Sequence, residues 1–399
     1  MQNLLSKFMV LSKTDTFRRT LGYFALFIVL GLDTGLGGPT LPSLAAQTQT
    51  RLGDMGWLFL AGSVGYTLGT LVGGRIFDRV RGHPVLGLSQ LAVAVLIAFI
   101  PSIPWLWLLL ALAVVKGFAA GLVNTGANTL LVWTHEEKAS PYMNALHFSF
   151  GLGAFLSPFL IAPLLTIEGG YRWAYWALAV IAALVGLRIL GMSGSPQPHR
   201  HVEGTEKTAP AAIPYPLVIT AALFLFFYVG AEITFGGWVY TYAVTLSLAT
   251  AAGAAYLTSG FWFSFTIGRL ISIPAATRFK PVQIIPLALL GCLIILGLGI
   301  LLPGSTTLIW ITSLGLGFFM APIWPTGFTL AGQSLKLTAR ASSIILLGDS
   351  LGGMVLPWLV GQVINLSGPQ VMIYMVFGSL VFNFLAYAGM LRLRKEKTG

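Results

Sequence analysis

Four charged residues interrupt segments of the chain that are otherwise apolar. Asp33, Lys116, Glu232 and Asp349 each lie well inside a long, mostly hydrophobic stretch. A charge held at such a depth in a membrane costs on the order of 2.5 to 3.5 kcal/mol, which favours a charged partner or an aqueous cavity nearby. Carboxylates and an ammonium group in a cavity can bind a cation, exchange a proton or hydrogen-bond a polar solute. The alternative is that each carboxylate only joins neighbouring helices.

The composition indicates that these residues are positioned by membrane-spanning helices. The 399 residues are 56% hydrophobic and only 9% charged, against roughly a quarter charged in a typical soluble protein. Apolar runs such as Leu91 to Ile100 do not alternate with polar residues, as the strands of a membrane barrel would. The fold class is therefore an all-α polytopic membrane protein.

Requiring about 20 mostly apolar residues per crossing predicts twelve transmembrane helices. The longest interruption contains four prolines and mixed charges and divides the chain into a first half of residues 1–192, a cytoplasmic linker of 193–213 and a second half of 214–399. The predicted spans are Thr20–Leu44, Met55–Phe77, Val85–Pro101, Trp105–Val132, Ala139–Leu165, Tyr171–Met192, Tyr215–Leu246, Ala251–Ile273, Val282–Leu302, Thr306–Gln333, Ala339–Leu366 and Gln370–Arg392.

Basic residues are distributed very unequally between the two sides of this layout. Twenty Lys and Arg, including Arg269, are assigned to the termini and to loops on one side, whereas only Arg51 and Arg172 are assigned to the other. Loops rich in Lys and Arg remain in the cytoplasm, so both termini are expected there, and the protein is expected in the plasma (inner) membrane. The net charge of +11 thus reflects topology and predicts no nucleic-acid partner.

Further polar residues within the spans predict a central cavity. Lys116, Asn124 and Asn128 are interpreted as one polar stripe along a helix. We expect several cavity residues to contact the substrate, and the predicted set is Lys116, Asn124, Asn128, His147, Glu232, Trp238 and Gln333. Asp33, Glu232 and Asp349 are the candidates for ion coupling, with Asp33 preferred because Pro39 follows it and can free carbonyl oxygens.

An internal repeat relates the two halves. Asp33 precedes Gly37 and Gly38 in the first predicted span, and Glu232 precedes Gly236 and Gly237 with the same spacing, 199 residues later. Transporters are commonly built from such duplicated halves, with a substrate site near the bilayer midplane.

The segment Gly74-Arg-Ile-Phe-Asp-Arg-Val-Arg-Gly82 supplies a family resemblance. It resembles the cytoplasmic Gly-x-x-x-Asp-Arg motif of the major facilitator superfamily, although the residues after Arg79 depart from the usual order. The resemblance implies the major facilitator fold, and it implies that Gly74, Asp78 and Arg79 form a conformational gate that holds cytoplasmic helix ends together in one state.

The segment Asn144-Ala-Leu-His-Phe-Ser-Phe-Gly-Leu-Gly153 is similar to the fucose:proton symporters and their sodium-dependent glucose transporter relatives. That resemblance implies coupling through an acid in the first span, which Asp33 matches. The acid that proton-driven members carry in the fourth span is absent, and Lys116 and Asn124 occupy that helix instead. Proton coupling, sodium coupling and uniport therefore all stay open.

These observations favour a secondary active transporter that moves a small polar solute, most plausibly a sugar, by alternating access. A proton-coupled drug or lipid exporter is the alternative, and a non-transporting receptor or scaffold is a weaker third. No motif predicts an enzyme, and the single cysteine, Cys292, predicts neither a disulfide nor a cysteine metal site. No cofactor is expected beyond a coupling proton or sodium ion, and the expected partners are the solute and the lipid bilayer, with the protein a monomer.

Overall fold

The computed structural model describes residues 2–196, 214–334 and 339–395, and nearly all of them are helical. Most of the predicted linker, 197–213, lies outside the described residues. The long helices of the first half are α1 (Gln2–Thr48), α2 (Gly56–Phe77), α3 (Gly82–Phe99), α4 (Leu106–His135), α5 (Ala139–Ile161) and α6 (Gly170–Leu190). Those of the second half are α7 (Tyr215–Thr245), α8 (Ala251–Arg278), α9 (Pro281–Leu301), α10 (Thr306–Met320), α11 (Ile323–Ser334), α12 (Ala339–Ser367) and α13 (Val371–Lys395).

Helix starts in the second half follow from local sequence. The Thr250 hydroxyl caps α8 by accepting a hydrogen bond from the Gly253 amide at 3.1 Å, and the Ser305 hydroxyl caps α10 by accepting one from Leu308 at 3.2 Å. Gly304 precedes that cap with φ of +96°, a conformation that favours glycine. These caps satisfy amide groups that the first helical turn leaves without partners.

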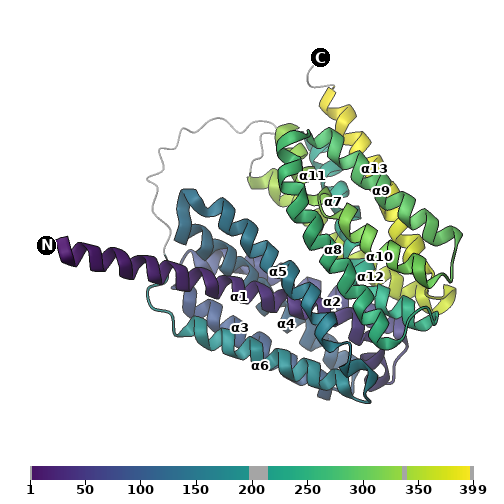
Figure 1. The fold of residues 1–399 in the computed structure, drawn as a ribbon, viewed down its shortest axis with the longest axis horizontal. Coiled ribbons are helices and arrows are strands. Elements are labelled where there is room, and N and C mark those ends of the chain that lie inside the picture. Colours follow the sequence, from purple (N-terminus) through teal and green to yellow (C-terminus); the bar gives the residue numbers. More distant parts are fainter. Residues whose placement is uncertain (1, 197–213, 335–338, 396–399) are drawn as a thin grey trace.

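The two groups of helices pack with the same pairing pattern. In the first group α1 packs on α5, α2 on α4 and α3 on α6; in the second, α7 packs on α12, α8 on α10 and α9 on α13. Figure 1 shows the two groups as separate bundles that meet at one end and diverge toward the other. This correspondence agrees with the repeat in the sequence.

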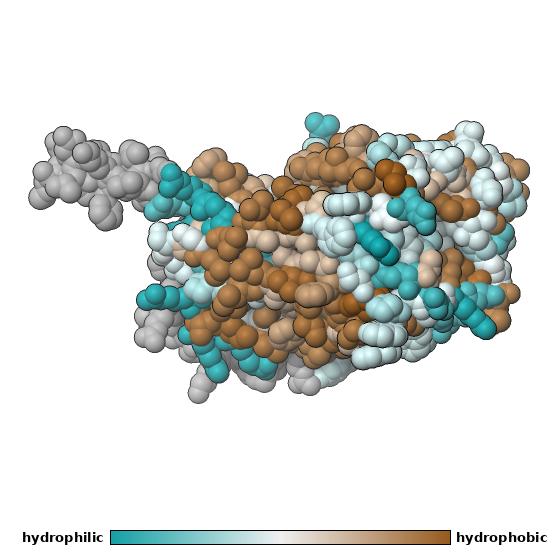
Figure 2. Space-filling view, turned by 90° about the horizontal axis from the view of Figure 1, so that it is seen from below, coloured by the Kyte–Doolittle hydropathy of each residue, from teal (hydrophilic) through white to brown (hydrophobic). Residues whose placement is uncertain are grey.

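Ten stretches of the described residues are long and apolar enough to cross a membrane. One of them, Leu106–Thr166, contains both α4 and α5, and α8 is not among the ten. The apolar character of α8 is reduced by polar residues such as Thr266, Arg269 and Ser272, which line a cavity described below. Figure 2 shows broad hydrophobic surface on one face of the molecule, as expected for a multi-pass membrane protein.

A proline separates α10 from α11, which the sequence predicts as one span. Pro322 has no amide hydrogen to continue the helical hydrogen bonds. The Tyr228 hydroxyl of α7 donates a hydrogen bond to the Met320 carbonyl at the break, at 2.9 Å. Broken helices are tolerated at membrane depth where other protein groups satisfy the backbone.

The two bundles meet through glycines at the end opposite the chain termini. Gly38 of α1 contacts the backbone of Gly236 and Gly237 of α7, so the glycine pairs of the sequence repeat meet directly. A Cβ atom on Gly38 would lie 2.8 Å from the Gly237 carbonyl oxygen. At a second contact, a Cβ atom on Gly361 of α12 would lie 2.8 Å from Gly56 Cα of α2.

A hydrogen bond and two aromatic side chains reinforce this contact. The Gly53 amide donates to Asn365 Oδ1 at 3.1 Å, from the short helix η1 (Leu52–Met55) to α12. Trp57 and Trp358 pack edge to face, with ring centroids 5.3 Å apart. We call this set of contacts the glycine seam.

Enlarging a glycine in the seam is expected to weaken it. Gly361→Ala forces two backbones apart and should destabilise the protein by about 1 to 3 kcal/mol, the usual cost of overpacking. Gly378→Ala in α13 is the control, because a Cβ atom there meets no atom within 4 Å. The midpoint of thermal unfolding in detergent is measured for both variants. Equal midpoints would contradict a close backbone contact at the seam.

Candidate functional site

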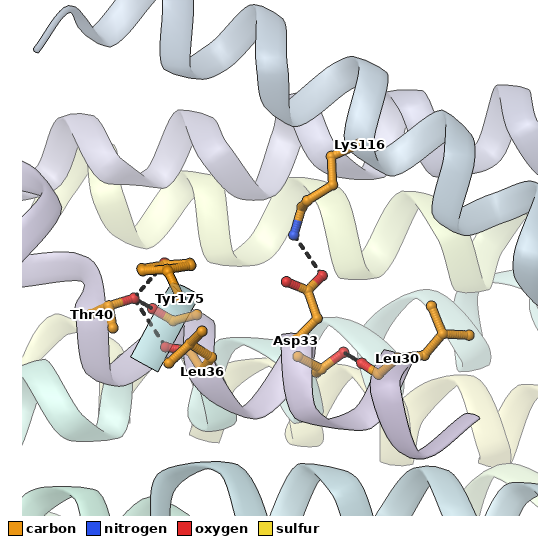
Figure 3. Close-up of polar contacts among 8 residues, drawn as sticks. Leu30, Asp33, Leu36, Thr40, Lys116 and Tyr175 are labelled. Atoms are coloured by element: carbon orange, nitrogen blue, oxygen red, sulfur yellow. Dashed lines mark hydrogen bonds and ion pairs between the residues drawn. The ribbon is translucent and has the colours of Figure 1, made fainter. Parts of the chain in front are cut away.

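Asp33 and Lys116 form an ion pair between α1 and α4. Lys116 Nζ lies 2.5 Å from Asp33 Oδ2, and the side chains are 20% and 15% exposed, respectively. Figure 3 shows the two side chains pointing toward each other from their helices. Direct pairing offsets much of the cost of burying each charge, so neither residue needs another partner to lie inside the bundle.

The helix that carries Asp33 does not loosen as expected. α1 runs without interruption through Pro39. The Thr40 hydroxyl lies 3.0 Å from the carbonyl oxygens of both Leu36 and Gly37 and 2.8 Å from the Tyr175 hydroxyl (Figure 3). The Leu36 and Gly37 carbonyls are thus contacted by a side chain, whereas the carbonyl that Pro39 leaves without an amide donor is that of Gly35, so a free carbonyl group beside Asp33 stays a prediction.

A cavity of about 770 Å³ lies between the two bundles. It is lined by residues of both halves, chiefly from α5, α8 and α11, with contributions from α2, α4, α7, α9 and α12. Its polar and charged lining residues are Asn124, Asn144, His147, Glu232, Thr266, Arg269, Ser272, Thr326, Thr329, Gln333 and Asp349. Its aromatic lining residues are Tyr66, Phe148, Phe150, Trp262, Phe265, Phe279 and Trp324.

Five of the predicted site residues line this cavity. They come from five helices and are Asn124, His147, Glu232, Gln333 and Asp349. The sequence separates some of them by more than 200 residues, so only the packing of the two halves brings them together.

Four other predicted site residues do not line the cavity. Asp33 and Lys116 bind each other, and the Asn128 amide donates to the Asn124 carbonyl at 2.8 Å. Trp238 is fully buried and its indole donates to the Pro357 carbonyl at 3.0 Å, toward the glycine seam.

The predicted gate residues lie at the junction of α2 and α3. α2 ends at Phe77, and Gly74, Asp78 and Arg79 are exposed. Within the described ranges neither Asp78 nor Arg79 forms an ion pair. Their role as a gate stays a prediction.

Arg269 is a cavity residue that the sequence does not predict. The charge count assigns it to a cytoplasmic loop, although the predicted span Ala251–Ile273 includes it, and in the structure it lies within α8 and lines the cavity. Trp262, Phe265, Thr266 and Arg269 all line the cavity with the spacing of one helix face. That periodicity is the signal that identifies this face in the sequence.

The charged lining residues are held by aromatic neighbours. The Arg269 guanidinium lies 4.6 Å from the centre of the Phe265 ring. The Trp324 indole donates to Asp349 Oδ1 at 2.7 Å and stacks on Phe328 with an interplanar angle of 4°. The result is a cavity with fixed hydrogen-bond donors, fixed acceptors and flat apolar surfaces, which suits a small polar solute.

The cavity opens toward the end of the molecule that contains both chain termini. Its lining includes Asn144 at the start of α5, Phe279 after α8 and Gln333 near the end of α11. At the same end, the Tyr387 hydroxyl of α13 donates to the Val282 carbonyl of α9. The glycine seam closes the opposite end, so the cavity is accessible from one side only.

Comparison with known families decides whether the chain belongs to a family of transporters. The family model described as Major Facilitator Superfamily matches residues 23–357. The chain belongs to the major facilitator superfamily. This superfamily consists of transporters rather than enzymes, which confirms the resemblance drawn from the segment at Gly74.

Several relatives within the superfamily match most of the chain. Sodium-dependent glucose transporter 1A of Mus musculus is 30% identical, covering 93% of this chain and 95% of the relative, and the Homo sapiens sodium-dependent glucose transporter 1 is 28% identical, covering 84% and 72%. The resemblance to this branch is thereby confirmed. The solved D-xylose-proton symporter shares the fold, with a TM-score of 0.75 at 14% identity, covering 94% of this chain and 96% of that structure.

Removing one member of the partly buried ion pair is expected to destabilise the protein. Lys116→Met leaves the Asp33 carboxylate without a partner, and because both side chains are partly exposed the cost should be below the about 3 to 5 kcal/mol of fully buried pairs. The double variant Asp33→Leu with Lys116→Met should recover most of that loss, because no unpaired charge remains. Thermal unfolding in detergent measures the three proteins, and a double variant as unstable as Lys116→Met would contradict the pairing.

Proposed function

We propose that the protein is a secondary active transporter that moves a sugar across the membrane by alternating access. The observation that carries the proposal is the cavity between the two bundles, which is lined by polar and aromatic residues and closed at one end by the glycine seam. If the closed end opened and the open end closed, the same site would face the other side of the membrane.

The proposed architecture is twelve transmembrane helices in two six-helix halves, residues 1–192 and 214–399, with the linker and both termini in the cytoplasm. The matched helix pairing supports two equivalent halves, with α10 and α11 together forming one crossing. The excess of Lys and Arg near the termini supports the orientation. In a plasma or inner membrane, the open cavity would then face the cytoplasm.

A sugar is the proposed substrate because its chemistry matches the lining. Hydroxyl groups both donate and accept hydrogen bonds, and the cavity offers amide, carboxylate and guanidinium groups. The carbon-bound face of a sugar ring packs on aromatic rings, which Trp262 and Trp324 supply. The relatives described above, which are named as glucose transporters, and the structurally similar xylose symporter agree with this substrate class.

A drug or lipid exporter fits the lining less well. A carrier of apolar compounds needs a cavity with few hydrogen-bonding groups. Here eleven polar or charged residues line the cavity. Phe148, Phe150 and Phe265 supply apolar surface, but polar residues from both halves lie among them.

For ion coupling we propose Asp33. Its carboxylate lies in the first span and is held by Lys116, a neighbour that would be released when Asp33 binds a proton or a sodium ion. Release of a buried ammonium group is a large electrostatic change, which can favour one state of the carrier over the other. Glu232 and Asp349 are the other candidates for the coupling site.

Uptake into proteoliposomes tests the proposed function. Labelled sugars are offered with and without imposed proton and sodium gradients, and at least one should accumulate. Asn124→Ala should raise KM about five- to hundredfold, because removing a hydrogen-bond partner that the bound sugar buries costs about 1 to 3 kcal/mol. Gln333→Ala should raise KM less, because Gln333 is exposed at the open end of the cavity. Gln370→Ala, outside the cavity, is the control, and unchanged KM in both cavity variants would show that this face is not the binding site.

Asp33→Asn tests the coupling site separately. The variant should lose uphill accumulation driven by an ion gradient but keep exchange of labelled for unlabelled sugar at equal concentrations, because the introduced amide oxygen can still accept a hydrogen bond from Lys116 while the ion step is removed. Gradient-driven uptake that persists in Asp33→Asn would transfer the coupling role to Glu232 or Asp349.

A further inference from the structure

Arg269 occupies an unusual position in the cavity wall. Its guanidinium packs over the Phe265 ring at 4.6 Å, which fixes the side chain against α8. Arg269 Nε is buried and has no hydrogen-bond partner among the described residues. A buried donor without an acceptor is unfavourable and rare in folded proteins, so the protein itself does not satisfy all the hydrogen-bonding groups of Arg269.

The neighbouring charged residues do not form an ion pair with this guanidinium. Glu232 of α7, Asp349 of α12 and His147 of α5 all interact with Arg269 electrostatically. Neither carboxylate approaches within ion-pair distance, so Arg269 has no direct anionic partner in the described part of the chain. Because Arg269 lines the cavity, the terminal N–H groups of its guanidinium are the ones that can reach a bound solute.

The charged residues of the cavity restrict which ligands can accept hydrogen bonds from Arg269. Two acids, Glu232 and Asp349, and one arginine line the cavity. A sugar acid or a sugar phosphate would bind Arg269 but would be repelled by both carboxylates. A neutral polyol avoids this repulsion, because its hydroxyl oxygens accept from the guanidinium while other hydroxyl groups donate to the carboxylates.

We propose that Arg269 is the substrate anchor and that, together with Glu232 and Asp349, it selects neutral sugars over anionic ones. The inference rests on the proposed function, since it names the substrate class of the same cavity. The planar guanidinium can hold two adjacent hydroxyl oxygens, a geometry that an ammonium group does not reproduce.

The test compares Arg269→Gln and Arg269→Lys with the control Arg278→Gln, an exposed residue at the end of the same helix. Each protein is reconstituted in liposomes, and KM and the maximal rate are measured for labelled D-glucose and its monodeoxy analogues. Arg269→Gln should raise KM about tenfold or more. Arg269→Lys should also raise KM, but by a smaller factor. Arg278→Gln should leave KM unchanged.

The deoxy analogues separate a contact to substrate from a merely structural role. If Arg269 binds a hydroxyl oxygen, the unmodified protein loses affinity for the analogue that lacks this oxygen, and Arg269→Gln no longer distinguishes that analogue from glucose. Gluconate should compete poorly with glucose in the unmodified protein. Unchanged KM in Arg269→Gln, or undiminished discrimination among the analogues, would overturn the inference while leaving the proposed function intact. No uptake of any sugar by the unmodified protein would overturn the proposed function itself.

Discussion

The cost of placing charge inside a membrane governs this structure. The intramembrane charged residues either form an ion pair or line the cavity. Asp33 and Lys116 form an ion pair between α1 and α4. Glu232, Asp349 and Arg269 line the cavity between the bundles. The helices around the cavity therefore carry polar faces, and α8 in particular is less apolar than its neighbours. A cavity that hydrates these groups is also one that can bind a hydroxylated solute.

Closure of the opposite end depends on close backbone contacts at glycines. The glycine pairs after Asp33 and Glu232 place Gly38 against Gly237, so each repeat supplies a charged residue near the centre and a close backbone contact beyond it. The seam also includes the hydrogen bond from Gly53 to Asn365 and the Trp57–Trp358 pair. Opening of this end in alternating access requires all of these contacts to separate.

Much of this arrangement follows from the sequence, and the failures have physical causes. Apolar runs predicted most helices, and charged or amide residues within them predicted five cavity residues. Asn124 lines the cavity while Lys116 does not, because eight residues of helix turn the second position by about 80° away from the first. Arg269 was missed because a cation near a predicted span end resembles a loop cation. Trp238 was misplaced because the sequence does not indicate which end of the carrier is closed.

The distance between the bundles at each end tests the central claim most directly. In a Cys292→Ser background, spin labels at Ser140→Cys and Thr277→Cys report the open end, and labels at Arg51→Cys and Leu366→Cys report the closed end; all four positions are exposed. In liposomes, addition of a transported sugar should shift part of the population to a shorter distance at the first pair and a longer distance at the second. Distances that stay unchanged at both ends with saturating sugar would contradict a carrier that works by alternating closure around this cavity.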